Sequence, residues 1–138
     1  MLESVKTNKF SCRVYYEDTD LAGIVYYANY LKFIERARSE WVRARGVDQI
    51  RLKDEAGIVF AVRRLEADYL APARFDDWLT VETEVVQLGG ARIVLDQVIL
   101  REEQRIFAAR VTLVCIGPAG AVRLPADIRQ RLDAASES

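Results

Sequence analysis

The sequence predicts a single α+β domain in which a mostly antiparallel sheet wraps around one long helix. Three observations indicate this fold class. A strand pattern comes first, one long helical pattern follows it, and four further strand patterns fill most of the remaining chain. A helix with one apolar face must bury that face, and a curved sheet can do so around a single helix. We assign residues 1–138 to this one domain, because the length suits one core and no repeat is apparent.

The first two predicted elements are a strand and a long helix, joined by a turn that contains glycine. Residues 10–16 alternate apolar and polar side chains, as a half-buried strand does. Across residues 27–44, apolar side chains recur at steps of three and four, which predicts an amphipathic helix. Gly46 is expected to end this helix in the left-handed conformation. Residues 17–23 carry three acids and a glycine between the two elements and are expected to form a turn.

Four more strands are predicted after a linker at residues 47–57. They are the apolar, β-rich runs at residues 58–70, 78–88, 91–100 and 106–116. In the first of these the alternation slips near Arg63 and Arg64, which indicates a bulge or a bend. The pair Gly89-Gly90 is expected to form a tight hairpin between the second and third runs. A short terminal helix is expected at residues 125–132.

Composition and charge narrow the classes of function. A formal net charge of −1 argues against a bulk polyanion such as nucleic acid as the partner. No apolar run approaches the roughly 20 residues that a membrane-spanning helix needs. The N-terminus lacks the apolar segment of a signal peptide, so we expect a cytoplasmic protein. Cys12 and Cys115 lie in strand-like runs and are expected to be buried thiols rather than a disulfide.

The chain contains no histidine. This absence excludes Ser-His-Asp and Cys-His catalytic machinery, imidazole metal sites and histidine-based dehydratase chemistry. Acid–base work near neutral pH must then come from carboxylates, tyrosine, lysine, thiols or bound water. No residue pattern specifies a metal, nucleotide or flavin site, so we expect no cofactor.

Asp20 is the candidate catalytic residue. Gly23 permits a sharp turn after it, so the free N–H groups of the first helical turn can face a ligand. Together with the helix dipole, these groups can hold an oxyanion while a carboxylate attacks the carbonyl carbon or activates a water. An aspartate ahead of a helix is also commonly a plain turn or N-cap residue. The other acids of the turn, Glu17 and Asp18, are expected to be solvated or turn-forming.

A fixed residue pattern around this turn resembles the signature of hotdog-fold thioesterases. The pattern reads Tyr16-x-x-x-Asp20-x-x-Gly23-x-Val25-x-Tyr27-x-Asn29-Tyr30, followed by Glu35-x-Ala37-Arg38. The 4-hydroxybenzoyl-CoA thioesterases and the Tol-Pal-associated YbgC-type acyl-CoA thioesterases are the groups it resembles. Residues 60–77 are also similar to the YbgC-type group, and the whole resemblance spans roughly residues 10–116.

The resemblance implies a hotdog fold, with a five-stranded antiparallel sheet wrapped around one long central helix. It implies a dimer with sites at the subunit interface, often paired into a homotetramer. It also implies that Asp20 is the catalytic aspartate and that the backbone N–H of Tyr27 binds the thioester carbonyl, with Gly23 allowing the approach. Many YbgC-type members carry a histidine at the position of Tyr27, so this chain would work without that imidazole.

Further substrate contacts are expected from aromatic and basic side chains. The expected substrate-binding set is Gly23, Val25, Tyr26, Tyr30, Arg63 and Arg64. The tyrosines would line an acyl pocket, although tyrosines at helical spacing are more often core residues. The arginines, with Arg74 and Arg92 as further candidates, would contact the phosphates of coenzyme A, although arginines on strands are usually solvated.

The sequence therefore predicts a thioesterase that hydrolyses an acyl-CoA, or an acyl-carrier-protein thioester, to a free acid and a thiol. Asp20 would act as nucleophile or as general base, since both mechanisms need the same carboxylate. The alternative is a non-catalytic acyl-thioester binding or scaffold module in lipid or envelope metabolism. In that case changing Asp20 would alter affinity only. Apolar residues on both sides of several strands favour a homo-oligomer.

Overall fold

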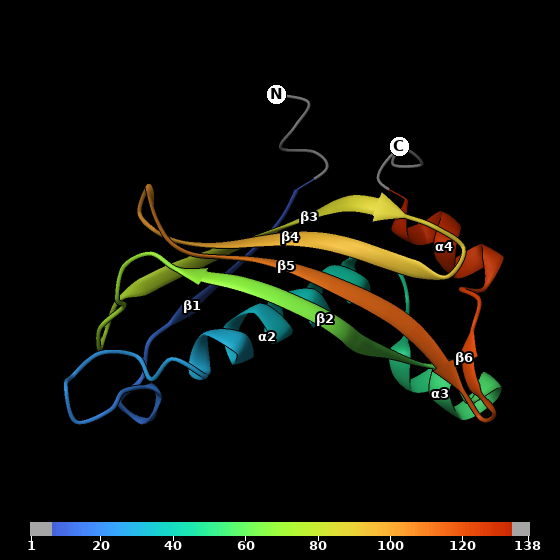
Figure 1. The fold of residues 1–138 in the computed structure, drawn as a ribbon, viewed down its shortest axis with the longest axis horizontal. Helices are drawn as coiled ribbons and strands as arrows, with labels where there is room; N and C mark the ends of the chain where they lie inside the picture. The colour runs from blue at the N-terminus through green and yellow to red at the C-terminus, as the bar shows by residue number, and fades with distance from the viewer. Residues whose placement is uncertain (1–6, 134–138) are drawn as a thin grey trace.

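In the computed structural model, which describes residues 7–133, an antiparallel sheet curves over one long helix (Figure 1). The strands are β1 (Asn8–Arg13), β2 (Val59–Tyr69), β3 (Trp78–Leu88), β4 (Arg92–Arg101), β5 (Gln104–Gly117) and β6 (Gly120–Val122). The helical elements are the 3₁₀ turn η1 (Tyr16–Asp18) and the helices α2 (Asn29–Ala44), α3 (Gln49–Ala56) and α4 (Ala126–Leu132). The strand order is β1-β3-β4-β5-β2, which leaves β1 and β2 at the edges. The predicted α+β class, with an antiparallel sheet around one long helix, is confirmed.

The central helix α2 lies against the concave face of the sheet because one of its faces is apolar. The buried side chains of that face include Tyr30, Phe33, Ile34, Ala37 and Trp41. At its C-terminal end, Gly46 adopts φ +83° and its N–H donates to the Arg43 carbonyl at 3.0 Å. The Val47 N–H donates to the Val42 carbonyl at 3.2 Å, which completes a Schellman motif. The predicted left-handed stop at Gly46 is confirmed.

The β2 strand carries the predicted bulge. Its pairing with β5 shifts register between Val62 and Arg64, so Arg63 is the extra residue. The hairpin at residues 89–90 and the terminal helix also form as expected. A second register shift, between Val85 and Gln87 in β3, was not predicted from the sequence.

The sheet has one strand more than the five predicted. After β5 the chain turns at Gly120, which has φ +117°, and β6 then pairs back onto β5 with Val122 opposite Cys115. The Gly-Pro-Ala-Gly sequence of this turn predicted only the end of a strand, because three residues are too few to show an alternation.

Helix α3 (Gln49–Ala56) forms within residues 47–57, where a linker was expected. Asp48 caps α3, since its Oδ1 accepts the N–H groups of Ile50 and Arg51 at 3.1 Å each. Gly57, at φ +68°, ends it. None of its side chains is buried, so the apolar periodicity that reveals a helix is missing.

The first strand is shorter than predicted at its C-terminal end. It ends at Arg13, and residues 16–18 form a 3₁₀ turn instead of continuing the strand. The Tyr15 N–H donates to Oδ2 of Asp18 at 2.8 Å, and this local bond takes the place of a ladder bond. Among residues 7–133, no helix combines the length and the apolarity needed to cross a membrane.

Candidate active site

The segment between β1 and α2, residues 15–28, holds the predicted catalytic residues; we call it the site loop. Its middle part forms a small hairpin, in which Thr19 pairs with Val25. The Asp20 N–H donates to the Ile24 carbonyl at 3.0 Å, and the Gly23 N–H donates to the Asp20 carbonyl at 2.9 Å. Gly23 has φ +80°, in the left-handed region that glycine enters most easily. The hairpin thus carries Asp20 at its entrance and needs Gly23 at its tip.

Asp20 is exposed and only partly engaged by its surroundings. Its Oδ1 accepts the Ala22 N–H at 2.9 Å, while Oδ2 has no hydrogen-bond partner within residues 7–133. Since α2 begins nine residues later, Asp20 is a turn residue and not the N-cap of that helix. One carboxylate oxygen is therefore available to a substrate or to a water molecule.

The N-terminus of α2 offers free backbone donors. Ala28 is the N-cap residue, and no side chain caps the helix there. In the part of the chain that the structure describes, the N–H groups of Tyr27 and Ala28 have no acceptor. The Tyr26 carbonyl accepts the Asn29 N–H at 2.8 Å, and the Tyr27 carbonyl accepts the Tyr69 hydroxyl at 2.9 Å. Free donors at the positive end of a helix dipole can bind an oxyanion.

Two exposed tyrosines stand beside these donors. The rings of Tyr26 and Tyr27 lie 4.8 Å apart, and they are 46% and 63% exposed. A hydrogen bond with the Tyr27 phenol raises the pKa of Tyr26 above its ordinary value, and the charge of Asp20 adds to this effect. The Tyr26 phenol therefore stays protonated at neutral pH and can only donate or accept a hydrogen bond.

Two of the residues expected to contact substrate are buried in the core of this chain. The Val25 and Tyr30 side chains are each only 3% exposed. The Tyr30 hydroxyl accepts the Ala73 N–H at 2.9 Å, and its ring stacks on Phe107 at 5.2 Å. In this single chain, Val25 and Tyr30 support the site loop from beneath.

Arg63 and Arg64 lie on β2, away from the site loop of their own chain. They precede Tyr69, which contacts the loop, by five to six residues, or about 16–20 Å of extended strand. The Arg64 guanidinium donates to Glu66 at 2.9 Å, with both side chains more than half exposed. Arg74 is nearer, since its backbone pairs with Ile24 of the hairpin. The structure thus places Asp20, Gly23, Tyr26 and Tyr27 on the site loop, and Arg63 and Arg64 on β2.

A pair of buried polar residues in the site loop escaped the sequence analysis. Asp18, expected to be solvated or turn-forming, is only 4% exposed, and Asn29 is 9% exposed. Oδ1 of Asp18 accepts the Asn29 side-chain amide at 2.7 Å, and Oδ2 accepts the Tyr15 N–H at 2.8 Å. The pattern that contains Asn29 was the only sequence signal for this pair, and it did not reveal the partner.

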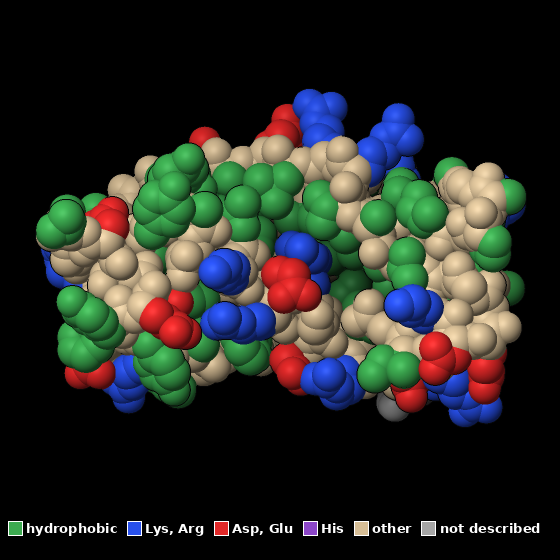
Figure 2. Space-filling view, turned by 90° about the horizontal axis from the view of Figure 1, so that it is seen from below, with side chains coloured by type: hydrophobic (Ala, Val, Ile, Leu, Met, Phe, Trp, Pro, Cys, Tyr) green, Lys and Arg blue, Asp and Glu red, His purple; other side chains and the backbone are tan. Residues whose placement is uncertain are grey.

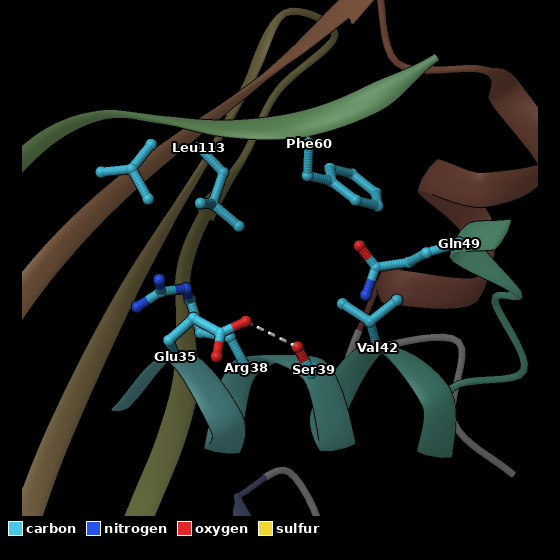
Figure 3. A pocket seen from close by; sticks show the side chains of 8 residues that line it. Glu35, Arg38, Ser39, Val42, Gln49, Phe60 and Leu113 are labelled. Atoms are coloured by element: carbon cyan, nitrogen blue, oxygen red, sulfur yellow. Dashed lines mark hydrogen bonds between the residues drawn. The ribbon is translucent and has the colours of Figure 1, made fainter. Parts of the chain in front are cut away.

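A cavity of about 200 Å³ opens between α2 and the β2–β5 part of the sheet (Figure 3). It is lined by Glu35, Arg38, Ser39, Val42, Gln49, Phe60, Val62 and Leu113. Glu35 accepts a hydrogen bond from Ser39 at 3.1 Å, while Arg38 donates to Gln97 at 3.0 Å. Burial lowers the pKa of Arg38 from its ordinary value. None of the predicted site residues lines this cavity, whose walls come from elements far apart in the sequence.

The α2 side of the molecule is hollowed. Figure 2 shows a hollow near the centre of this face, with acidic and basic side chains beside it. Hydrophobic side chains lie on both sides of this hollow, including the end of the molecule where the site loop lies in Figure 1. The large exposed apolar side chains of this region include Tyr15, Tyr16, Leu21, Tyr26, Tyr27, Phe75 and Trp78. An apolar approach to the site suits a substrate with a hydrocarbon or aromatic part.

The two thiols play no visible part in this site. Cys12 and Cys115 are free, and Cys115 is buried while Cys12 is half-buried. Burial raises the pKa of both thiols, so both remain protonated at neutral pH and neither is an activated nucleophile. Among residues 7–133, no three His, Cys, Asp or Glu side chains form a group that could hold a metal ion.

Comparison with known proteins places the chain in a family. A family model described as the thioesterase superfamily matches residues 22–108. The acyl-CoA thioesterase YbgC of Haemophilus influenzae is 41% identical over 122 residues, which cover 87% of this chain and 90% of that protein. The acyl-CoA thioester hydrolase YbgC of Escherichia coli O6:H1 is 41% identical over 111 residues, which cover 80% of this chain and 82% of that protein.

A solved structure of the same kind agrees with the fold. The 4-hydroxybenzoyl CoA thioesterase from Pseudomonas sp. strain CBS-3 superposes with a TM-score of 0.86 at 25% identity, covering 91% of this chain and 99% of that chain. This agreement confirms the hotdog fold that the residue pattern implied. Together with the family match and the two relatives, it shows that the chain belongs to the thioesterase superfamily.

Proposed function

We propose that this protein hydrolyses acyl-CoA thioesters to a carboxylic acid and coenzyme A, with Asp20 and the Tyr27 N–H as its catalytic groups. The observation that carries the proposal is an exposed, half-engaged carboxylate on the same short loop as the uncapped N-terminus of α2. The names of the YbgC relatives, an acyl-CoA thioesterase and an acyl-CoA thioester hydrolase, support the substrate class.

Each catalytic group has one task. The thioester oxygen accepts the Tyr27 N–H, and the negative charge that develops on it is stabilised by that donor and by the helix dipole. Asp20 either attacks the carbonyl carbon, giving an anhydride that water then hydrolyses, or it takes a proton from the attacking water. In both routes the carbon–sulfur bond breaks, and coenzyme A leaves as a thiolate that takes up the proton lost by the attacking water. Water that attacks the acyl carbon leaves its oxygen in the acid, and Asp20 is regenerated as a carboxylate. Neither route requires a histidine.

The cavity beside α2 is the candidate site for the far end of a long acyl group. Of the residues that line it, Glu35 is the nearest to Tyr27 in the sequence. It follows Tyr27 by eight residues, or about 12 Å along a helix. Apolar walls from Val62 and Leu113 suit a hydrocarbon chain, while Glu35 and Arg38 offer polar contacts. Activity across acyl groups of different length tests this assignment.

A second copy of the chain completes the proposed site. Arg63 and Arg64 lie far from the site loop of their own chain but on the open edge strand β2, where another copy can pair. In a homodimer or homotetramer, these arginines would contact the coenzyme A phosphates at the partner's site. Acyl-carrier-protein thioesters as substrates, a cytoplasmic location and an association with the Tol-Pal system are further parts of this proposal.

Thiol release from a panel of short, long and aromatic acyl-CoAs tests the assignment of Asp20. For Asp20→Asn we expect kcat/KM to fall at least ~100-fold, equivalent to about 2.7 kcal/mol of transition-state stabilisation. Glu17→Gln is the matched control, because Glu17 is an exposed acid of the same loop and should keep wild-type turnover. If the wild type binds acyl-CoA but releases no thiol from any of them, the protein is a binding module.

A further inference from the structure

The buried carboxylate of Asp18 lies at the junction of three segments. Its Oδ2 accepts the Tyr15 N–H at 2.8 Å, where the chain leaves β1. Its Oδ1 accepts the side-chain amide of Asn29 at 2.7 Å, at the first residue of α2. Its backbone carbonyl accepts the Tyr26 N–H at 3.0 Å. A buried carboxylate is tolerated only when such donors satisfy it, and here they come from both halves of the site loop.

These bonds flank the two proposed catalytic groups on both sides. Asp18 precedes Asp20 by two residues, and Asn29 follows Tyr27 by two. The side-chain bond between Asp18 and Asn29 therefore joins the half of the loop that carries the carboxylate to the half that carries the oxyanion donor. The Asn29 backbone N–H donates to the Tyr26 carbonyl at 2.8 Å, and this carbonyl belongs to the same peptide group as the Tyr27 N–H.

We propose that the Asp18–Asn29 pair positions the Tyr27 N–H against Asp20, so that a thioester meets both groups at once. The inference rests on the proposed function, and it assigns to Asp18 and Asn29 no contact with substrate. Displacements of about 1 Å at reacting groups can lower the rate by about 10²-fold. Loss of this tie should therefore lower kcat while leaving KM nearly unchanged.

A carboxylate that only positions other groups needs its hydrogen bonds, whereas a catalytic carboxylate also needs its negative charge. In Asp18→Asn, the new side-chain oxygen can still accept the Tyr15 N–H, and the new amide can donate to the Asn29 oxygen once the Asn29 amide has turned over. Both links survive without the negative charge. In Asp18→Leu, which has a similar shape, both links are lost.

The test compares steady-state turnover of acyl-CoA by folded Asp18→Asn, Asp18→Leu and Asn29→Ala. We expect Asp18→Asn to keep kcat within ~3-fold of wild type, whereas Asp18→Leu and Asn29→Ala lose at least ~10-fold in kcat with similar KM. Asn29→Ala guards against a failure of Asp18→Leu to fold, because alanine is favourable in a helix. Ile128→Ala in α4 is the stability control, since it weakens the core far along the chain and should leave kcat unchanged.

Two results would overturn the positioning role. One is an unchanged kcat in both folded Asp18→Leu and Asn29→Ala. The other is an Asp18→Asn variant as inactive as Asp20→Asn, because Asp18 would then act through its charge.

Asp20→Asn is measured in the same series, so the two proposals can be told apart. If only Asp20→Asn loses activity, the catalytic assignment stands and the positioning role fails. If Asp20→Asn keeps full activity, the site assignment falls and the positioning role falls with it.

Discussion

Gly23 shows how one residue sets the geometry of the site loop. Its φ of +80° lies where side chains with a Cβ are disfavoured, yet an added Cβ would meet no atom within 4 Å. The cost of a substitution here is therefore almost purely conformational. Asparagine enters this region more easily than alanine does, so the two substitutions separate backbone strain from every other effect.

We expect Gly23→Ala to lower kcat more than Gly23→Asn does, because alanine resists the turn that presents Asp20. The free energy of unfolding should fall by roughly 1–2 kcal/mol for Gly23→Ala and by less for Gly23→Asn. Thermal denaturation and acyl-CoA turnover measure the two effects. Gly120→Ala is the matched control, since Gly120 also has positive φ and open space around it, but lies in the β5–β6 turn. Equal losses of kcat at both positions would argue against a special role for Gly23.

At the residue scale, the sequence predicts exposed site residues better than buried ones. The turn at Gly23, the exposure of Asp20 and the placement of Tyr27 at a helix start all follow from local rules about turns and helix ends. The burial of Asp18 does not, because its partner Asn29 lies eleven residues away and only the folded loop brings them together.

At the scale of elements, one buried side chain connects the central helix to two strands. Gln97 of β4 is fully buried, and its amide donates to the Ile34 carbonyl of α2 and to the Thr83 hydroxyl of β3, both at 2.9 Å. Its side-chain oxygen accepts from Arg38, whose guanidinium lines the cavity. A polar group in this position can therefore fix the position of α2 relative to the sheet.

Breaking this network should cost more than the loss of one hydrogen bond. We expect Gln97→Met to lower the free energy of unfolding by about 1–3 kcal/mol, because Thr83 and Arg38 lose a buried partner. Thr83→Val should also be destabilising alone. The double variant should lose less than the sum of the two, since it removes both ends of one bond. Chemical denaturation of the four proteins measures this coupling, and strict additivity would contradict it.

Apolar periodicity in the sequence predicts some of the helices and strands but not others. The central helix and the long strands are predictable because each buries one face along many residues. Helix α3 buries no residue and β6 has only three, so neither leaves a periodic signal. Local interactions stabilise both elements instead: Asp48 caps α3, and Gly120 permits the turn into β6.

At the scale of the whole molecule, a second copy could bind either to a face of the sheet or to the edge strand β2. On β4 and β5, the Arg110 guanidinium donates to both carboxylate oxygens of Asp96 at 2.8 and 3.0 Å. Val94, also on β4, is buried within the single chain, with only 8% of its surface exposed. The sequence predicts a second copy because apolar residues occur on both sides of several strands. The face that carries Arg110 and Asp96 gives little support for a second copy binding there. The edge strand β2 gives more support. Its Val62 and Tyr69 side chains are 47% and 49% exposed, and β5 pairs with only one of its edges.

We expect the wild type to have at least twice the 15.7 kDa mass of one chain in light scattering. Val62→Lys should shift the protein towards one chain, because a lysine on an edge strand opposes pairing with a second copy. Val86→Lys is the matched control, since Val86 is similarly exposed at 45% but lies on β3, away from that edge. If a second copy completes the site, turnover per chain should fall when the wild type is diluted until its mass approaches that of one chain; turnover is read on the wild type because Val62 also lines the cavity beside α2. A wild type that is monomeric and fully active at every concentration would show that a single chain holds the complete site.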